Sequence, residues 1–275
     1  MLNQNFAITF VRSITTAWIM CALLLFGSSG AHGADKKGGG QAKSSTLSAQ
    51  SKHSLELNEQ GVAAVQRRDY ASAESLFRRA LDTDDHNITA VFNLAGVYIT
   101  NKKESQAIPL LTKYSQLFPK DAGLMARLGD AYFSSQNPKN AITSYEKALA
   151  IDGSYPGVAA RLGTLYALQN KLAKAATMYE RAVKENPRDA NALQNLSNLY
   201  LGLGKPQQAI TTAKKALQIS STAEAYVTLG NAYQELKDDR NALISFQRAK
   251  ELGHKDPALS KVIESLEERT TKGTT

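Results

Sequence analysis

The stretch RLGDAYFSSQNPKNAITSYEKALAID at residues 127–152 is followed by RLGTLYALQNKLAKAATMYERAVKEN at residues 161–186. Arg-Leu-Gly, a Tyr, the pair Tyr-Glu and an Ala return at the same places after 34 residues. Self-similarity at a period of this size is typical of proteins in which one supersecondary unit is stacked several times. We therefore expect a repeat architecture.

The same period extends over residues 54–256 and defines rows of residues that occupy one position in successive repeats. A leucine row contains Leu94, Leu128, Leu162, Leu196 and Leu229. The row one residue behind it is small, with Gly61, Ala95, Gly129, Gly163, Ser197 and Gly230. A tyrosine row contains Tyr98, Tyr132, Tyr166, Tyr200 and Tyr233. A later row of mostly large residues contains Phe77, Leu111, Tyr145, Tyr179, Ala213 and Phe246.

Each repeat shows two segments in which apolar residues recur at helical spacing. Between them, SQNPK at residues 135–139 and LGKPQ at residues 203–207 combine Gly, Asn and Pro as helix ends do. Each repeat is therefore predicted to be two helices, with the small row receiving the bulky side chains of the partner helix. One repeat cannot bury both of its faces alone, so the repeats should stack.

The rows resemble the tetratricopeptide repeat, whose Leu-Gly, Tyr, Ala, Phe, Ala and Pro pattern they follow over residues 54–256. The resemblance implies an all-α fold, a right-handed α-solenoid of six helix-turn-helix repeats. The repeats are expected at residues 54–87, 88–121, 122–155, 156–189, 190–222 and 223–256. The sequence departs from the family pattern at Gln60 and Ala64 in the first repeat and at Ala213 in the fifth, which is one residue short.

After the repeats, residues 257–269 place Leu259, Val262, Ile263 and Leu266 on one helical face. This pattern predicts a helix that caps the open end of the stack. Residues 270–275 read TTKGTT and are predicted to be a disordered tail.

The N-terminal region differs from the repeats. Residues 1–33 contain one charged residue, Arg12, before the apolar run at residues 17–26 and the small residues SSGAHGA. This order predicts a secretory signal peptide, and ten helical residues reach only about 15 Å, roughly half of a bilayer core. The alternative is an uncleaved anchor to the inner membrane formed by residues 6–26. Residues 34–53 are rich in Gly, Ser and Lys and predict a flexible basic linker. The repeats are then expected to be periplasmic or secreted.

The composition gives little support to catalysis. The chain contains 33 Lys and Arg against 25 Asp and Glu, a net charge of +8, and its single cysteine is Cys21 within the apolar run. After cleavage, His53, His86 and His254 are too far apart in sequence to suggest a metal-ligand pair. We expect no enzyme activity, no cofactor, no metal site and no nucleic-acid partner, whereas the basic balance allows an anionic partner or a merely solvated surface.

Polar residues recur on the first helix of each repeat, at positions that the apolar rows do not use. In the family this face lines a concave groove that holds partner peptides, and residues three apart on a helix share a face. The predicted peptide-binding groove contains Asn93, Arg127, Asp130, Arg161, Asn195, Asn198 and Asn231, with Phe92 and Phe133. Asn matches the donors and acceptors of an extended backbone, Arg presents a fork for anions, and Phe offers apolar pockets. Alternatively, Arg127 and Asp130 simply pair with each other.

The resemblance implies a non-catalytic scaffold that binds a protein or peptide partner in its groove. With an export signal, it resembles bacterial cell-envelope proteins that assist pilus or secretion machinery, and it is expected to assemble or position an envelope complex. The alternative function is binding of an anionic or carbohydrate cell-envelope polymer. A membrane partner is expected only if residues 6–26 remain uncleaved, and self-association through end stacking depends on how well the two ends are capped.

Overall fold

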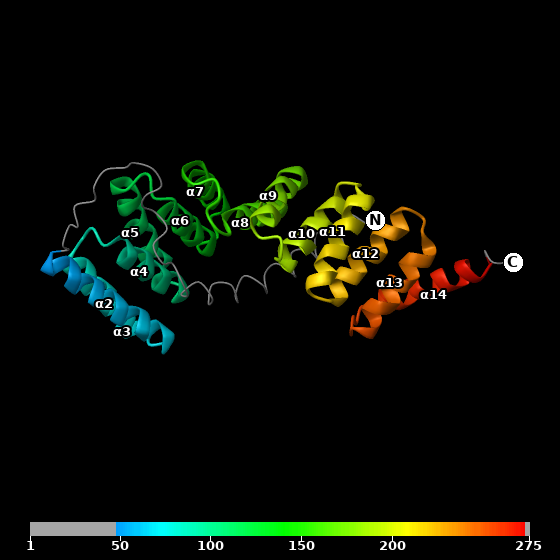
Figure 1. Ribbon diagram of the computed structural model, residues 1–275, viewed down its shortest axis with the longest axis horizontal. Coiled ribbons are helices and arrows are strands. Elements are labelled where there is room, and N and C mark those ends of the chain that lie inside the picture. Colours follow the sequence, from blue (N-terminus) through cyan, green and yellow to red (C-terminus); the bar gives the residue numbers. More distant parts are fainter. Residues whose placement is uncertain (1–47, 273–275) are drawn as a thin grey trace, which may run out of the picture. The chain divides into compact units, whose positions relative to one another are not determined.

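The computed structural model describes residues 48–272, which form an all-α helical-repeat solenoid of thirteen helices with no strand in that range (Figure 1). Six helix pairs follow one another, each with a first and a second helix, before a single final helix. The pairs are α2 (Ala49–Gln66) with α3 (Tyr70–Thr83), α4 (Ile88–Thr100) with α5 (Glu104–Leu117), α6 (Ala122–Ser134) with α7 (Pro138–Ile151), α8 (Val158–Leu168) with α9 (Leu172–Glu185), α10 (Ala190–Gly202) with α11 (Pro206–Ile219), and α12 (Ala223–Glu235) with α13 (Asp239–Glu251); the final helix is α14 (Pro257–Lys272).

The helices fall into two compact units. The N-terminal unit is residues 48–155 with α2–α7, and the C-terminal unit is residues 156–272 with α8–α14. Within each unit, the two helices of a pair pack on each other, and the second helix packs on the first helix of the next pair. First helices also contact each other, as α2 does with α4, α4 with α6 and α10 with α12. Each unit therefore buries a continuous core that no single pair could enclose.

Local sequence signals fix where the helices begin and how each pair turns. The side chains of Asp121, Asp189 and Thr222 each accept a hydrogen bond from the backbone N–H three residues ahead and so cap α6, α10 and α12. The turn within each pair uses one left-handed residue at a recurring position, with φ between 56° and 66°. These residues are Arg68, Lys102, Gln136, Asn170, Gly204 and Lys237. Among them only Gly204 adopts this conformation without a Cβ penalty.

The core of each repeat depends on the match between the small row and the bulky row. A Cβ added at Gly163 would lie 2.8 Å from the ring of Tyr179, so the glycine lets the ring approach the backbone of α8. Gly61 with Phe77, Gly129 with Tyr145 and Gly230 with Phe246 repeat this contact. The prediction that the small row receives the bulk of the partner helix is confirmed.

Repeats two and five have other residues at both the glycine position and the aromatic position. In repeat two Ala95 stands with Leu111, and in repeat five Ser197 stands with Ala213; all four residues are fully buried. The hydroxyl of Ser197 donates to the backbone carbonyl of Ala209 at 2.8 Å. A larger residue on the first helix thus accompanies a smaller one on the second, which explains why Ala213 departs from the family pattern.

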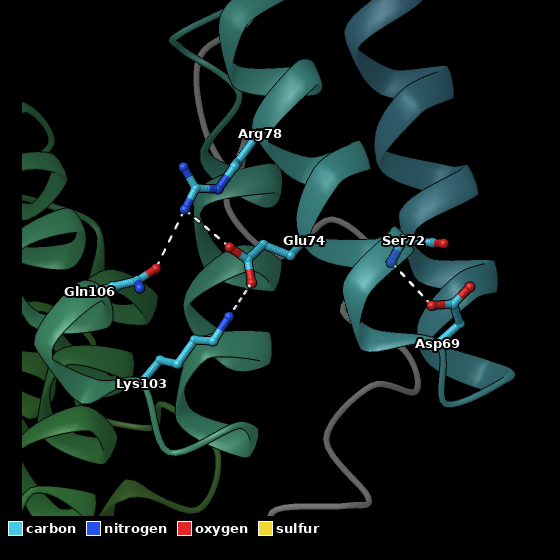
Figure 2. A network of polar contacts seen from close by, with 6 residues as sticks. All are labelled: Asp69, Ser72, Glu74, Arg78, Lys103 and Gln106. Atoms are coloured by element: carbon cyan, nitrogen blue, oxygen red, sulfur yellow. Dashed lines mark hydrogen bonds and ion pairs between the residues drawn. The ribbon is translucent and has the colours of Figure 1, made fainter.

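Polar contacts join α3 to the start of α5, the second helices of the first two pairs, as Figure 2 shows. Glu74 of α3 accepts hydrogen bonds from Nζ of Lys103 at 2.8 Å and from Nη2 of Arg78 at 3.0 Å. Arg78 also donates to Oε1 of Gln106 at 3.4 Å. The hydrogen bond from Lys103 is the main reason why the pKa of Glu74 lies below its ordinary value, and Arg78 adds to the effect.

Two predicted boundaries need correction. The linker was expected to extend to residue 53, but α2 begins at Ala49 because the hydroxyl of Ser48 accepts from the N–H of Ser51 and caps it. The tail was expected from residue 270, but α14 continues to Lys272, with the hydroxyl of Thr270 bonded back to the carbonyl of Leu266 at 2.9 Å. Residues 1–47 and 273–275 lie outside the described residues, and with them the predicted signal peptide, the anchor at residues 6–26 and most of the linker.

The final helix covers the last repeat. Leu259, Ile263 and Leu266 of α14 are buried in a cluster with Ala242, Phe246 and Ala249 of α13. Lys261 and Glu264 on α14 remain exposed. Within residues 48–272, no helix has both the length and the apolar character that a membrane crossing requires.

Candidate functional site

The predicted groove residues of the N-terminal unit lie on the first helices α4 and α6, where several of them contact one another. We call the set Asn58, Phe92, Asn93, Arg127 and Asp130 the N-terminal ladder. Nδ2 of Asn93 donates to Oδ1 of Asn58 on α2 at 3.0 Å. Asn58 is buried, with 6% of its surface exposed. The pair therefore links α2 to α4 through amide groups.

Arg127 of α6 is held by Phe92 of α4 and by Asp130 of its own helix. Its guanidinium carbon lies 3.8 Å from the ring centroid of Phe92, and Nη1 lies 3.7 Å from Oδ2 of Asp130. Only 8% of Arg127 is exposed. Stacking on a ring and pairing with a carboxylate are both favourable for a guanidinium. The pairing that was left open from the sequence is thus present, and the expected fork for an external anion already has internal partners.

Asp130 extends this arrangement into the core. Its Oδ1 accepts a hydrogen bond from the hydroxyl of Tyr145 on α7 at 2.7 Å. Tyr145 is the fully buried ring that packs on Gly129. The orientation of Asp130 is therefore coupled to core packing. Phe133, also predicted to line the groove, is half-buried on the same helix.

In the C-terminal unit most of the polar residues on first helices form two hydrogen-bonded groups, and Asn231 belongs to neither. We call the set Gln194, Asn195, Asn198, Thr228 and Asn231 the C-terminal ladder. Nδ2 of Asn195 donates to the hydroxyl oxygen of Tyr179 at 3.1 Å, and this oxygen lies 2.6 Å from Oγ1 of Thr164. Burial raises the pKa of Tyr179 to about 12, so its hydroxyl stays protonated at neutral pH.

The second group joins α10 to α12. Nε2 of Gln194 donates to Oγ1 of Thr228 at 2.7 Å and to Oδ1 of Asn198 at 3.3 Å, while the Thr228 hydroxyl lies 2.7 Å from the same oxygen of Asn198. Among the described residues, the buried Oε1 of Gln194 has no hydrogen-bond partner. Asn231 is exposed on α12, and Arg161 is half-buried on α8.

A common register underlies the contacts between first helices. Asn58 with Asn93, and Phe92 with Arg127, each join the fifth residue of one repeat to the sixth residue of the next. Gln194 with Thr228 follows the same rule. These two residues are 34 and not 35 positions apart, because the fifth repeat is one residue short. The structure therefore adds Asn58, Gln194 and Thr228 to the predicted set. The row of fifth residues carries the missing signal for Asn58 and Gln194, because it supplies the side chains that meet the sixth residues of the next repeat.

One acidic cluster lies outside the ladders. Asp84, Asp85 and His86 lie within 4.8 Å of one another in the turn between α3 and α4. Oδ1 of Asp84 accepts from the backbone N–H of His86, and Oδ1 of Asp85 lies 2.6 Å from its Nδ1. Such local bonds are the usual role of Asp in turns, so this cluster offers no argument for a metal.

Comparison with protein families identifies the repeat. A family model described as the tetratricopeptide repeat matches residues 64–128, 132–199 and 167–229, more than half of the chain. Two further models with the same description match residues 223–252 and 105–156. The chain is also 26% identical, over 99 residues, to the small glutamine-rich tetratricopeptide repeat-containing protein 2 of Mycosarcoma maydis. That match covers 36% of this chain and 28% of the relative, so the chain spans less than a third of the relative's length.

Solved structures share the fold. The crystal structure of MamA is 26% identical, with a TM-score of 0.52 over 58% of this chain and 93% of its own. YrrB, described as a TPR protein with an unusual peptide-binding site, is 20% identical, with a TM-score of 0.62 over 69% of this chain and 97% of its own. PilF of Pseudomonas aeruginosa is 17% identical, with a TM-score of 0.64 over 80% of this chain and 99% of its own. At their identities, YrrB and PilF are evidence of the fold alone.

Proposed function

We propose, because this chain belongs to the tetratricopeptide repeat family, that it is a scaffold that binds an extended segment of a partner protein along its first helices. Repeat proteins of this family are generally non-catalytic scaffolds for protein interactions. The observation that carries the proposal is the pair of ladders. Amide and hydroxyl side chains replace apolar ones on successive first helices and are held in place by hydrogen bonds between helices.

The chemistry of the ladders suits a polypeptide main chain. An amide side chain has donors and an acceptor, and Asn93 uses one donor on Asn58 while its carbonyl oxygen makes no hydrogen bond among the described residues. Asn198 likewise uses its oxygen within the ladder and retains its amide donors. Main-chain N–H and C=O groups are the complementary partners, and they are the same in every peptide. The peptide-binding site described for YrrB supports such a use of this fold.

Asn231 provides the sharpest test, because it is exposed and makes no hydrogen bond to another described side chain. The full chain would first be used to select binders from a random peptide library, and affinities would then be measured by calorimetry. We expect Asn231→Ala to weaken the selected peptides about fivefold or more, as loss of a hydrogen bond does, without changing the melting temperature.

Asn140→Ala is the matched control, since Asn140 is an exposed amide on the second helix α7. It should leave both affinity and stability unchanged. Equal affinity of wild type and Asn231→Ala for every selected peptide would contradict the C-terminal ladder as the binding surface.

We also propose that residues 1–33 direct export and that the scaffold assembles or positions a complex of the bacterial cell envelope, such as one for pili or secretion. The support is the order of charge, apolar run and small residues in the sequence. The mass of the protein purified from expressing bacteria should correspond to a chain beginning at residue 32 or 34. A full-length chain that sediments with membranes would favour the anchor at residues 6–26 instead.

A further inference from the structure

Positive charge is distributed unevenly between the two units. Residues 48–155 contain 12 basic and 12 acidic residues, whereas residues 156–272 contain 17 basic and 12 acidic residues, a net charge of +5. The whole excess is present in residues 171–215, with eight basic and three acidic residues. This segment covers α9, α10 and most of α11. Both units are built from the same repeat, so the excess is a feature of these helices and not of the fold.

The three acidic residues of this segment are engaged by nearby groups. Glu180 accepts a hydrogen bond from the hydroxyl of Tyr200 at 2.9 Å. Glu185 lies 3.4 Å from Nε of Arg181, and Asp189 caps α10 by accepting from the N–H of Ala192 at 3.0 Å. Each of these carboxylates therefore already has a hydrogen-bond or ion-pair partner in the protein.

Five basic residues of the segment are exposed and have neither an acidic partner nor an aromatic ring beneath them within residues 48–272. We call this set the basic face: Lys171, Lys184, Arg188, Lys205 and Lys215. Lys171 immediately precedes α9 and Lys184 lies in its last turn, a separation of about 20 Å along the helix. Because α10 packs against both α9 and α11, the two helices that carry these charges flank a common neighbour. An array this long suits a repeating polyanion better than a single small ion.

A small, open hollow lies between α10 and α11. It has a volume of about 280 Å³ and is lined by Tyr200 of α10 and by Gln207, Gln208, Thr211 and Thr212 of α11. The bond from Tyr200 to Glu180 places α9 at the same junction. Hydroxyl and amide groups both donate and accept, as the hydroxyls of a sugar do. A hollow this small accommodates one polar unit of a longer molecule and not a drug-sized ligand.

We propose that the basic face and this hollow form a second binding surface, for an acidic polysaccharide, separate from the ladders. The charges of the basic face neutralise the carboxylates of the polymer along α9 and α11, and the hollow receives the hydroxyls of one sugar unit. An acidic polypeptide complements the charges but has no hydroxyl-rich ring for the hollow. This surface lies outside the predicted peptide-binding groove, in which Arg127 is stacked on Phe92 and paired with Asp130.

The test measures binding of the full chain to polygalacturonate, with poly-L-glutamate, neutral dextran and phosphatidylglycerol vesicles as alternatives. The variant that replaces all five residues of the basic face with Gln should lose about tenfold or more in affinity for polygalacturonate at about 0.15 M salt, and wild-type binding should disappear near 1 M salt, where the screening length falls to about 3 Å. Gln208→Ala/Thr211→Ala should weaken polygalacturonate about threefold or more and leave poly-L-glutamate unchanged.

The matched control removes five charges from the N-terminal unit: Arg79→Gln, Lys113→Gln, Lys120→Gln, Lys139→Gln and Lys147→Gln. It should bind polygalacturonate within about twofold of wild type, because these charges lie on another unit. Equal losses in both variants would mean that net charge alone binds the polymer and would overturn the proposal. It is likewise overturned if poly-L-glutamate or vesicles bind as tightly as polygalacturonate, or if polygalacturonate does not bind. Circular dichroism confirms that each variant is folded before it is compared.

Discussion

Gly230 of α12 lies directly against the ring of Phe246 on α13, so that a Cβ added at the glycine would stand 2.5 Å from Cε1 of the ring. Both residues are buried. The same first-helix position holds Ala95 in repeat two, where the second helix supplies Leu111 in place of an aromatic residue. The chain thus fills the same space in two ways, with Gly and Phe in one repeat and with Ala and Leu in another. Substituting Ala and Leu for Gly230 and Phe246 tests whether the two combinations are equivalent.

Gly230→Ala is expected to lower the free energy of unfolding by about 1–2 kcal/mol. Overpacking of a core costs about 1–3 kcal/mol, and part of this is offset by the better helix propensity of Ala. Adding Phe246→Leu should recover stability relative to the sum of the single changes, with a coupling of about 1 kcal/mol or more. Urea denaturation of the four proteins measures the cycle. Strict additivity would show that the two positions do not share volume.

These packing rows could be predicted from the sequence because they connect residues at one position in every repeat. The rows of Gly129 and Tyr145 are visible in a single chain, and helical spacing is enough to place them in the core. The turn position of Gly204 is less visible, because four residue types other than Gly occupy the left-handed conformation in the remaining repeats. Propensity alone does not reveal a conformation that tertiary packing imposes.

The ladder was predicted only in part, for a geometric reason. Side chains on neighbouring first helices meet with an offset of one residue, so Asn58 contacts Asn93 and not the residue aligned with it. The stacking of Arg127 on Phe92 has the same origin. An alignment of repeats compares equivalent positions and does not show which different positions come into contact. This is why the stacking of Arg127 on Phe92 was not predicted, whereas its pairing with Asp130 on the same helix was one of the two alternatives.

Glu74 should make the stability of the N-terminal unit depend on pH. Its folded-state pKa lies below the ordinary value of 4.5, so its contribution is present above that value and is lost as pH falls through the folded-state pKa. Glu74→Gln should cost about 0.5–1 kcal/mol at neutral pH on this solvent-accessible surface, and the difference from wild type should shrink below pH 4.5. Thermal unfolding across this pH range checks the trend. Glu59→Gln, an exposed control on α2, should show no such trend.

The left-handed turn position offers a stabilising change. Gln136 adopts φ of 58° and is exposed, so its side chain is not needed for packing. Gln136→Gly should raise the free energy of unfolding by about 0.5–1 kcal/mol, because relief of the Cβ clash exceeds the extra entropy of the unfolded glycine. The reverse change, Gly204→Gln, should lower it by a similar amount. The midpoints of chemical denaturation compare both variants with wild type, and a loss at position 136 would contradict the argument.

The final helix should protect the last repeat. Leu266 is fully buried in the cluster formed by α13 and α14, so Leu266→Ala should cost about 2–5 kcal/mol. Loosening of α14 exposes the apolar surface of α13, and we expect self-association that increases with protein concentration in sedimentation measurements. Glu264→Ala on the exposed side of α14 is the control and should remain within about 0.5 kcal/mol of wild type. A Leu266→Ala protein as stable as wild type would mean that α14 does not act as a cap.

Thr228 should be the structural centre of the C-terminal ladder, in contrast to the exposed Asn231. Its hydroxyl accepts from Gln194, lies within hydrogen-bond distance of Asn198, and is 96% shielded from solvent. Thr228→Val keeps the shape but leaves the amide of Gln194 without this acceptor, so it should cost about 1–3 kcal/mol. Thr228→Ser retains the hydroxyl and should lose less. Chemical denaturation distinguishes the variants; if Val is tolerated as well as Ser, the hydrogen bonds between α10 and α12 do not hold the ladder in place, and its preorganisation for a partner must come from packing alone.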